Sequence, residues 1–343
     1  MISVVIPVYN AAVTLGRCLN SVLMQNAGPM DVIVVDDGST DVSGSVAAAY
    51  GARIKVLVQE NQGQAAARNA GLAAAAGQYV AFLDADDYWL PGFLKASSEF
   101  LDAHPEAVAV SAGQLIKVWG KPPRIRPRLL ESKNENVEPR VLDDFFGFWA
   151  RHDHIRTGSV LIRRDTIERA GYQRPDLRLC EDLEYWGYLA TFGAWGFIPP
   201  VLFVSDGTAA AASTGWLRKY VARGRMCPTV EQWQERIVPR LQDGDWEGFR
   251  RVRGRIAATF AHAKIVGGDD GAALRIVRRY GADFARRWST RLMLYGASGS
   301  GKWGIACRML RLRERGKGLL IWLTSALGRR DDYRPLVRQI PSK

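Results

Sequence analysis

The first 110 residues alternate short hydrophobic runs with segments in which hydrophobic residues recur at helical spacing. The runs predict buried strands and the spaced segments predict helices. Strands alternating with helices are typical of a mostly parallel, Rossmann-like sheet flanked by helices, so the sequence predicts an α/β fold. The expected strands cover residues 2–9, 30–39, 53–60 and 78–87, and the expected helices cover residues 12–26 and 63–77, the second closed by Gly77.

The pattern changes after residue 110. Residues 117–140 are rich in proline and charge, which predicts a long loop or lid. Ordered structure is expected again at 156–204, with two further strands and a helix running from Glu181 to Phe192. Basic amphipathic helices follow. We therefore expect two domains, residues 1–215 and 216–343, the second mainly helical.

Composition narrows the class of protein. The 343 residues are 47% hydrophobic, enough to bury a sizeable core. The four cysteines lie far apart, which argues against a disulfide framework or zinc ribbon and favours a reducing compartment. The N-terminus has no pattern of a secretory signal, and the longest later hydrophobic stretch, 319–327, is too short to span a membrane. A cytoplasmic protein is expected.

The net charge of +12 is unevenly distributed. Residues 1–215 contain 19 lysines and arginines against 24 acidic residues, whereas residues 216–343 contain 28 against 11. Such a basic region commonly meets phosphate, although a solvated helical surface is the alternative. A nucleic-acid-reading motif is not found, and tryptophans among the arginines favour an anionic membrane surface, contacted from the inner face of the cell membrane.

Polar residues follow the expected strands at their carboxyl ends, where parallel sheets bind ligands. Tyr9 offers a ring on which a nucleobase can rest, and Asp37 offers an acceptor for the imide N–H of uracil or thymine. An Asx turn that caps the next helix is the alternative for Asp37, and it suits Asp41 better.

The segment "FLDADDYW" places three carboxylates at the end of a hydrophobic strand. Asp84 and Asp86 lie two residues apart, so their side chains share one face of an extended chain. A divalent cation, Mn²⁺ or Mg²⁺, held by so few carboxylates keeps positions open for phosphate oxygens. Asp87 is expected to cap the helix that follows.

Four segments, in this order, resemble the inverting glycosyltransferases of family two, which have the A-type nucleotide-diphospho-sugar transferase fold. They are "VVIPVYN", "VVDDGSTD", "ENQGQAAARNAGLAAAAGQYVAFLDADD" and "CEDLEYW", within residues 1 to about 205. The resemblance implies metal-dependent transfer of a sugar from a nucleotide-diphosphate donor, with UDP-sugar favoured. The acceptor would be a hydroxyl of a saccharide or lipid-linked molecule in polysaccharide or glycoconjugate assembly. A nucleotide-sugar-binding module without turnover is the alternative.

The resemblance also implies roles for single residues. Asp182 would deprotonate the acceptor hydroxyl, Glu181 would support it, and Trp186 would line the acceptor side. Two acids in a first helical turn also complement the helix dipole, which is the structural alternative. Asp86 would hold the metal, and Asp84 would lie near the ribose or the cation. The other expected nucleotide contacts are Pro7, Tyr9, Asn10, Asp37 and Arg68, where solvent exposure is the alternative for Arg68.

Two further patterns are weaker. His152 and His154 lack nearby partners for a zinc site and are expected in the acceptor site or a loop. "GASGSGKW" at 296–303 matches a phosphate-binding loop, but Trp303 stands where a hydroxyl should reach magnesium. A glycine-rich turn between helices, or a small accessory unit, is the favoured interpretation.

Overall fold

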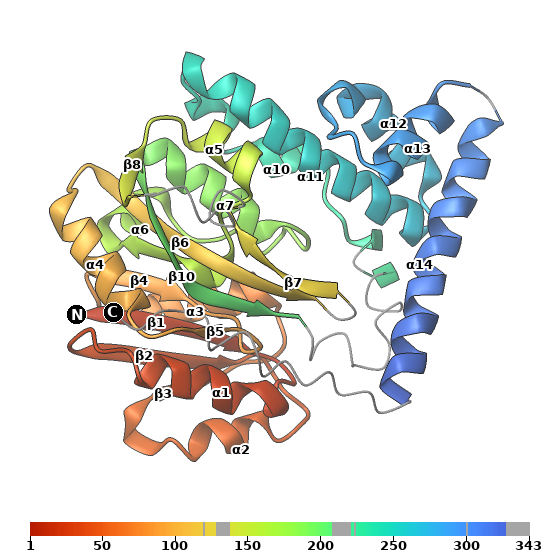
Figure 1. The fold of residues 1–343 in the computed structure, drawn as a ribbon. Coiled ribbons are helices and arrows are strands. Elements are labelled where there is room, and N and C mark those ends of the chain that lie inside the picture. The colour runs from red at the N-terminus through yellow and green to blue at the C-terminus, as the bar shows by residue number, and fades with distance from the viewer. Residues whose placement is uncertain (119–120, 128–137, 208–220, 223, 300, 327–343) are drawn as a thin grey trace.

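The computed structural model describes residues 1–118, 121–127, 138–207, 221–222, 224–299 and 301–326. One mixed sheet runs through it in the order β3-β2-β1-β4-β9-β6-β10-β5, with β7 beside β6 and β8 beside β10 (Figure 1). The strands are β1 (Ile2–Val8), β2 (Met30–Asp36), β3 (Lys55–Val58), β4 (Tyr79–Phe82), β5 (Tyr88–Trp89), β6 (Ala107–Val118), β7 (Lys121–Arg126), β8 (Arg140–Leu142), β9 (Val160–Arg163) and β10 (Ala194–Asp206).

Helices flank the sheet and fill the C-terminal region (Figure 1). They are α1 (Ala12–Leu23), α2 (Ser43–Ala48), α3 (Gln64–Ala74), α4 (Phe93–Ala103), α5 (Phe145–His152), α6 (Arg164–Ala170), α7 (Glu181–Leu189), α10 (Val230–Gln234), α11 (Trp246–Gly267), α12 (Asp270–Tyr280), α13 (Trp288–Ala297) and α14 (Lys302–Ala326). The predicted fold class, α/β with a helical C-terminal region, is confirmed.

Strand β1 shows why the sheet has two cores. Its seven residues are all buried, and successive side chains point to opposite faces. Val5 joins the core on the side of α3, α5 and α7. Val4 and Ile6 join the core on the side of α1 and α4. A strand buried on both faces reads as a continuous hydrophobic run, which is the pattern that predicted it.

The first half of the sheet is parallel, whereas strand β9 in its middle is antiparallel to its neighbours. Strands β3, β2, β1 and β4 run parallel, but β9 lies antiparallel between β4 and β6. Strand β6, the buried partner of β10, was not expected from the sequence. The end of β6 also pairs with β7, so the expectation of a loop at 117–140 is wrong for residues 117–118, 121–126 and 140. Prolines at 122 and 123 are tolerated there because β7 is an edge strand. Residues 128–137 lie outside the described residues.

Two expected helix signals serve other purposes. Helix α3 ends at Ala74, before the expected stop at Gly77. A Cβ on Gly77 would lie 2.5 Å from the backbone nitrogen of Ser3, so this glycine permits close approach to β1 instead. Asp87 does not cap α4, which begins six residues later at Phe93 after Gly92. The Asp87 carboxylate accepts from the backbone N–H of Asp206, 2.7 Å away, at the end of β10.

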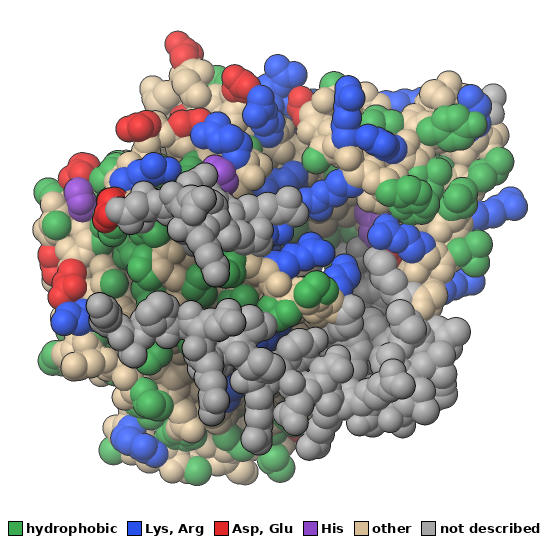
Figure 2. All heavy atoms as spheres, in the orientation of Figure 1, with side chains coloured by type: hydrophobic (Ala, Val, Ile, Leu, Met, Phe, Trp, Pro, Cys, Tyr) green, Lys and Arg blue, Asp and Glu red, His purple; other side chains and the backbone are tan. Residues whose placement is uncertain are grey.

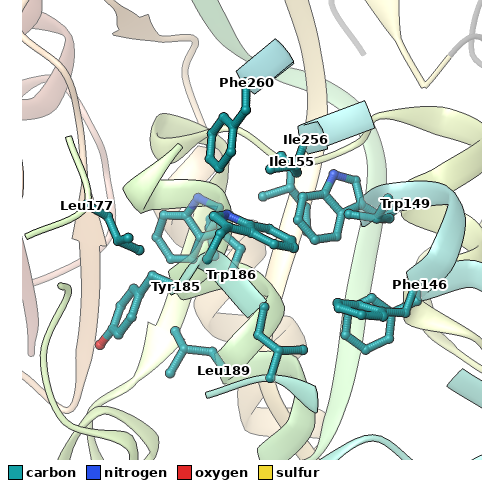
Figure 3. Close-up of a cluster of buried hydrophobic side chains, with 14 of the residues drawn as sticks. Phe146, Trp149, Ile155, Leu177, Tyr185, Trp186, Leu189, Ile256 and Phe260 are labelled. Atoms are coloured by element: carbon teal, nitrogen blue, oxygen red, sulfur yellow. The ribbon is translucent and has the colours of Figure 1, made fainter. Parts of the chain in front are cut away.

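The C-terminal helices share a core with the sheet region. Trp149 of α5 and Trp186 of α7 belong to the same buried cluster as Ile256 and Phe260 of α11 (Figure 3). The buried carboxylate of Glu184 also accepts two bonds from Arg236, at 2.8 and 2.6 Å. The described helices therefore hold α5 and α7 in place. The expected boundary near 215 lies outside the described residues.

Helices α13 and α14 decide how the glycine-rich stretch at 296–303 is interpreted. The segment 291–295 is helical, since α13 ends at Ala297 and α14 begins at Lys302. The glycine-rich stretch thus lies between two helices, as one of the two favoured interpretations predicted. A phosphate-binding loop would follow a strand. Along the described stretches of chain, none of the helices combines the length and the apolar character needed to cross a bilayer.

Candidate active site

The carboxyl ends of β1, β2 and β4 meet at one edge of the sheet, as the sequence predicted. The backbone N–H of Asp37 donates to the Val8 carbonyl at 2.8 Å, and that of Leu83 donates to the Val5 carbonyl at 3.1 Å. The segments after the three strands are therefore neighbours, and their polar residues form one surface.

Asn10 joins the end of β1 to the turn after β2. Its Oδ1 accepts from the backbone N–H groups of Thr40 at 2.7 Å and Asp41 at 3.2 Å, and its own backbone N–H donates to Ser39 Oγ at 3.0 Å. Asn10 has a positive φ of 51°, which asparagine tolerates better than most residues. Tyr9 beside it is 50% exposed, so its ring is free to meet a ligand.

Asp37 is buried and orders the loop after β3. One carboxylate oxygen accepts from Gln59 Nε2 at 2.7 Å and from the Gln62 N–H at 2.8 Å, and the other accepts from the Gly63 N–H at 2.9 Å. The second oxygen keeps a lone pair for a further donor. The Asx turn expected for Asp41 is present, since Asp41 accepts from the Ser43 N–H at 2.9 Å. Asp41 is not the N-cap of α2, however, because that position is Val42, which has no side-chain cap bond.

Arg68 is the central cation of the site. It is 1% exposed, so the alternative of a solvent-facing arginine is wrong. Its Nη2 donates to Asp84 Oδ1 at 2.7 Å, and the two glutamines near it, Gln64 and Gln173, lie at 3.3 and 3.4 Å. Small alanines around it on α3 leave room for the guanidinium under the Asp84 turn.

Arg68 also lies close to the acidic residues Glu181 and Asp182 of α7, which form a second acidic motif beside that of Asp84 to Asp87. Burial lowers its pKa, but the carboxylates of Asp84, then Asp182 and Glu181, outweigh that effect and raise the pKa above its ordinary value. The two motifs, distant in sequence, are therefore brought together around one buried guanidinium.

The Asp84 to Asp87 turn carries unbalanced negative charge. Burial, and then the charge of Asp84, raise the pKa of Asp86 to about 6. Burial, Asp84 and Asp86 also raise the pKa of Asp87. Asp206 is the acidic residue of β10 nearest this turn, and it is neutralised by Arg17 at 2.7 Å. A cation beside Asp86 would remove the repulsion.

The residues present fit a magnesium- or manganese-type ion. In the part of the chain that the structure describes, no three His, Cys, Asp or Glu side chains form a ready metal site. These ions are commonly held by one or two carboxylates, with the other positions filled by phosphate and water. Asp86, with Asp84 beside it, supplies that donor set.

Helix α7 presents the second acidic motif. Asp182 Oδ2 accepts from the hydroxyl of Thr157 at 3.3 Å. Burial, and then the charge of Asp182, raise the pKa of Glu181 to about 7. Sequence patterns did not point to Thr157, because a single threonine before a strand carries no periodic or motif signal.

Trp186 lies below this motif and is completely buried. Its ring is 6.1 Å from that of Phe82 on β4. Its indole Nε1 has no hydrogen-bond partner among the described residues. Trp186 therefore fixes α7 against the sheet, and contact with an acceptor stays a prediction.

The two histidines pack against aromatic rings. His154 lies in the irregular segment after α5, as the loop interpretation predicted, but it is fully buried among the rings of Phe145, Phe148 and Phe197. Contact of His154 with an acceptor is therefore not supported. Burial lowers its pKa well below the ordinary value, which keeps it neutral. His152 ends α5 and packs on Phe148.

Comparison with known proteins identifies the family. The model of the family described as glycosyl transferase family 2 matches residues 3–169. TuaG of Bacillus subtilis, a candidate teichuronic acid biosynthesis glycosyltransferase, is 32% identical over 190 residues, which are 54% of this chain and 70% of TuaG. The chain belongs to glycosyl transferase family 2. The expected resemblance is thereby confirmed.

Other family 2 relatives match over shorter parts. An uncharacterized glycosyltransferase of Nostoc sp. is 51% identical over 94 residues, 26% of this chain and 29% of that protein. The uncharacterized glycosyltransferase EpsJ of Bacillus subtilis is 28% identical over 188 residues, 54% of this chain and 53% of EpsJ. This chain thus spans only part of these relatives.

Solved structures share the fold over nearly the whole chain. TarS 1–349 of S. aureus, in complex with UDP-GlcNAc, has a TM-score of 0.60 at 18% identity and covers 92% of this chain and 91% of its own. The mannosyltransferase PcManGT of Pyrobaculum calidifontis, in complex with GDP-Man and Mn²⁺, has a TM-score of 0.52 at 19% identity and covers 95% and 86%.

Proposed function

We propose that this family 2 member is an inverting, metal-dependent glycosyltransferase of hexosyl type. It would move a sugar from a nucleotide-diphosphate donor to a hydroxyl of a saccharide or lipid-linked acceptor in polysaccharide or glycoconjugate assembly. The observation that carries the proposal is the cluster around Arg68, where the 2.7 Å ion pair with Asp84 brings the first acidic motif close to Glu181 and Asp182. A donor site and a base thereby share one edge of the sheet.

Asp182 is the proposed general base. In a single displacement the acceptor hydroxyl attacks the anomeric carbon and loses its proton, and one positioned carboxylate can accept that proton. The Thr157 hydroxyl bonds Oδ2 of Asp182 and orients it, which leaves Oδ1 for the acceptor. Burial and the charge of Asp182 raise the pKa of Glu181 to about 7, so Glu181 would be partly protonated near neutral pH and would repel the Asp182 carboxylate less.

Asp86, with Asp84, is the proposed holder of a divalent cation, Mn²⁺ or Mg²⁺. When bound, the cation would neutralise charge on the leaving diphosphate. Arg68 holds one oxygen of Asp84 and so fixes the direction of that carboxylate. The Mn²⁺ in PcManGT, which shares the fold, is consistent with this use of the edge.

The opposite end of the edge is the proposed nucleotide site. Tyr9 and Asn10, which are exposed, form its wall, next to Pro7, which is buried in β1. The free lone pair of Asp37 would accept from an imide N–H. A uracil base has that donor, which favours UDP-sugar. TarS, similar in fold, was solved with UDP-GlcNAc.

The C-terminal helices are the proposed membrane contact, on the inner face of the cell membrane. Large hydrophobic side chains are exposed on α13 and α14, among them Trp288 at 52% and Leu312 at 65%. Cations lie beside them, since Arg313 stacks on Trp288 at 5.0 Å. Figure 2 shows hydrophobic and basic side chains mixed on this side of the molecule. Aromatic rings with cations suit an anionic lipid surface.

The catalytic proposal is tested with Asp182→Asn and the matched control Glu168→Gln, an exposed acid on α6. Transfer from UDP-sugars to a panel of saccharide acceptors is measured together with UDP affinity. Loss of transfer in Asp182→Asn alone, with UDP affinity kept, supports the base. Wild-type transfer by Asp182→Asn refutes the assignment. UDP binding without turnover in the wild type supports the binding-module alternative.

The membrane proposal is tested by pelleting with phosphatidylglycerol vesicles. Ile305→Gln with Leu312→Gln should abolish pelleting. The control, Val13→Gln with Val58→Gln, replaces two hydrophobic residues that are exposed on the sheet region. Equal pelleting of the two double variants contradicts the proposal.

A further inference from the structure

An arginine-lined cavity that is open to solvent lies where α5, α11 and the segment after α12 meet. It has a volume of about 410 Å³. We call it the arginine cavity, since Arg250, Arg251 and Arg255 line it together with Glu247, Asp283 and Phe284.

The acids near this cavity occupy few of the arginine donors. Arg251 lies 2.5 Å from Glu247, and Arg250 lies 3.3 Å from Asp283. Both arginines are more than half exposed. A guanidinium has five N–H donors, so most of the donors of this pair remain available to a ligand.

Arg255 is the least exposed of the three arginines that line the cavity. Its side chain is 22% exposed and lies 3.4 Å from Asp153. Burial lowers its pKa, and the charges of Arg287 and Arg156 add to that effect against the opposing carboxylate of Asp153. An anion bound in the cavity would relieve this repulsion.

A short segment connects the cavity with the proposed base. Asp153 contacts Arg255 at 3.4 Å and Arg156 at 3.8 Å, and the next residue, Thr157, bonds Asp182. The contacts of the nucleotide end come from the ends of β1 and β2 instead. Residues 153–157 therefore contact both an arginine of the cavity and the proposed base.

We propose that the arginine cavity binds a phosphate group of the acceptor. Guanidinium forks match phosphate oxygens in geometry and charge, and several forks around one space are a common solution for this anion. The inference rests on the proposed glycosyltransferase function and adds the acceptor class: a phosphorylated molecule. The phosphate can belong to a soluble phosphorylated saccharide or to a prenyl-diphosphate carrier, and the chemistry of recognition is the same.

The test measures binding of two probes to the full chain by calorimetry, with saturating UDP present to fill the nucleotide end. The probes are inorganic pyrophosphate and farnesyl diphosphate. The variant Arg250→Ala with Arg251→Ala removes two exposed cations of the cavity. The control, Arg275→Ala with Arg278→Ala, removes two exposed cations of α12 and the same net charge. Unfolding temperatures of both are compared with the wild type.

Loss of two charge-assisted contacts should lower the affinity of the cavity variant for both probes about tenfold or more. The affinities of the control variant should stay near those of the wild type. Tighter binding of farnesyl diphosphate than of pyrophosphate by the wild type would assign the phosphate to a lipid carrier, and equal binding to a soluble acceptor. Equal affinities in the two variants, or no binding to the wild type, overturn the inference. UDP affinity and the Asp182→Asn result test the proposed function separately.

Discussion

Replacing Arg68 by methionine should destabilise the protein by breaking the ion pair at the centre of the site. Methionine keeps most of the side-chain volume, so the lost interaction dominates over a cavity effect. Removing one partner of a buried pair typically costs 3–5 kcal/mol. Asp84 is 32% exposed and can recover hydration, which reduces the expected loss to about 2–3 kcal/mol.

The double variant sharpens this expectation. Asp84→Asn in the Arg68→Met background removes the charge that was left unpaired, so the double variant should be more stable than Arg68→Met alone, by about 1 kcal/mol. Urea unfolding followed by fluorescence measures all three free energies of unfolding. With a slope of about 3 kcal/mol per M, Arg68→Met should lower the midpoint by nearly 1 M.

Arg275→Met, an exposed arginine of α12, is the control and should change the free energy of unfolding by less than about 0.5 kcal/mol. A loss below about 1 kcal/mol in Arg68→Met, or strictly additive effects of Arg68→Met and Asp84→Asn, would show that the 2.7 Å contact does not hold the site together.

Three further predictions follow from single contacts. The pKa of Asp86, about 6, exceeds its unfolded value, so the folded state binds more protons than the unfolded state between about pH 4 and pH 6, and the contribution of Asp86 to stability is lost as pH rises through 6. Asp86→Asn should therefore flatten the pH dependence of the unfolding free energy in this range. Mn²⁺ affinity, followed by calorimetry, should fall below pH 6 because protons compete for the carboxylate. Thr157→Val removes the hydroxyl that bonds Asp182 and should lower kcat about tenfold with UDP affinity unchanged; an unchanged kcat would contradict the orienting role. Gly71→Ala places a Cβ 2.2 Å from Val5 Cγ1 and should cost about 1–3 kcal/mol in thermal unfolding, whereas Gly304→Ala on α14, with open space, should not destabilise.

The sequence predicted the first half of the fold well because its signals are local. Strands buried on both faces leave continuous hydrophobic runs, and polar residues directly after them mark the ligand edge. The positions of Asp37, Asp84 and Asp86 at that edge followed from these runs alone. The family resemblance added Asp182, whose role no periodic pattern indicates, and that role remains a proposal.

The sequence alone did not predict β6 or the antiparallel placement of β9, because strand order depends on contacts between distant segments. It also could not assign burial. Arg68, His154 and Trp186 are polar or amphipathic side chains that sequence patterns place equally well at a surface.

The sequence by itself thus determined the fold class, the family and the strand ends that carry the acidic motifs. Only the tertiary structure decided that Arg68 is buried against Asp84 near Glu181 and Asp182, that Thr157 bonds Asp182, and that α11 shares a core with α5 and α7. The physical reason is that charge pairing and burial are set by distances across the fold, whereas hydrophobic periodicity is set by neighbours along the chain.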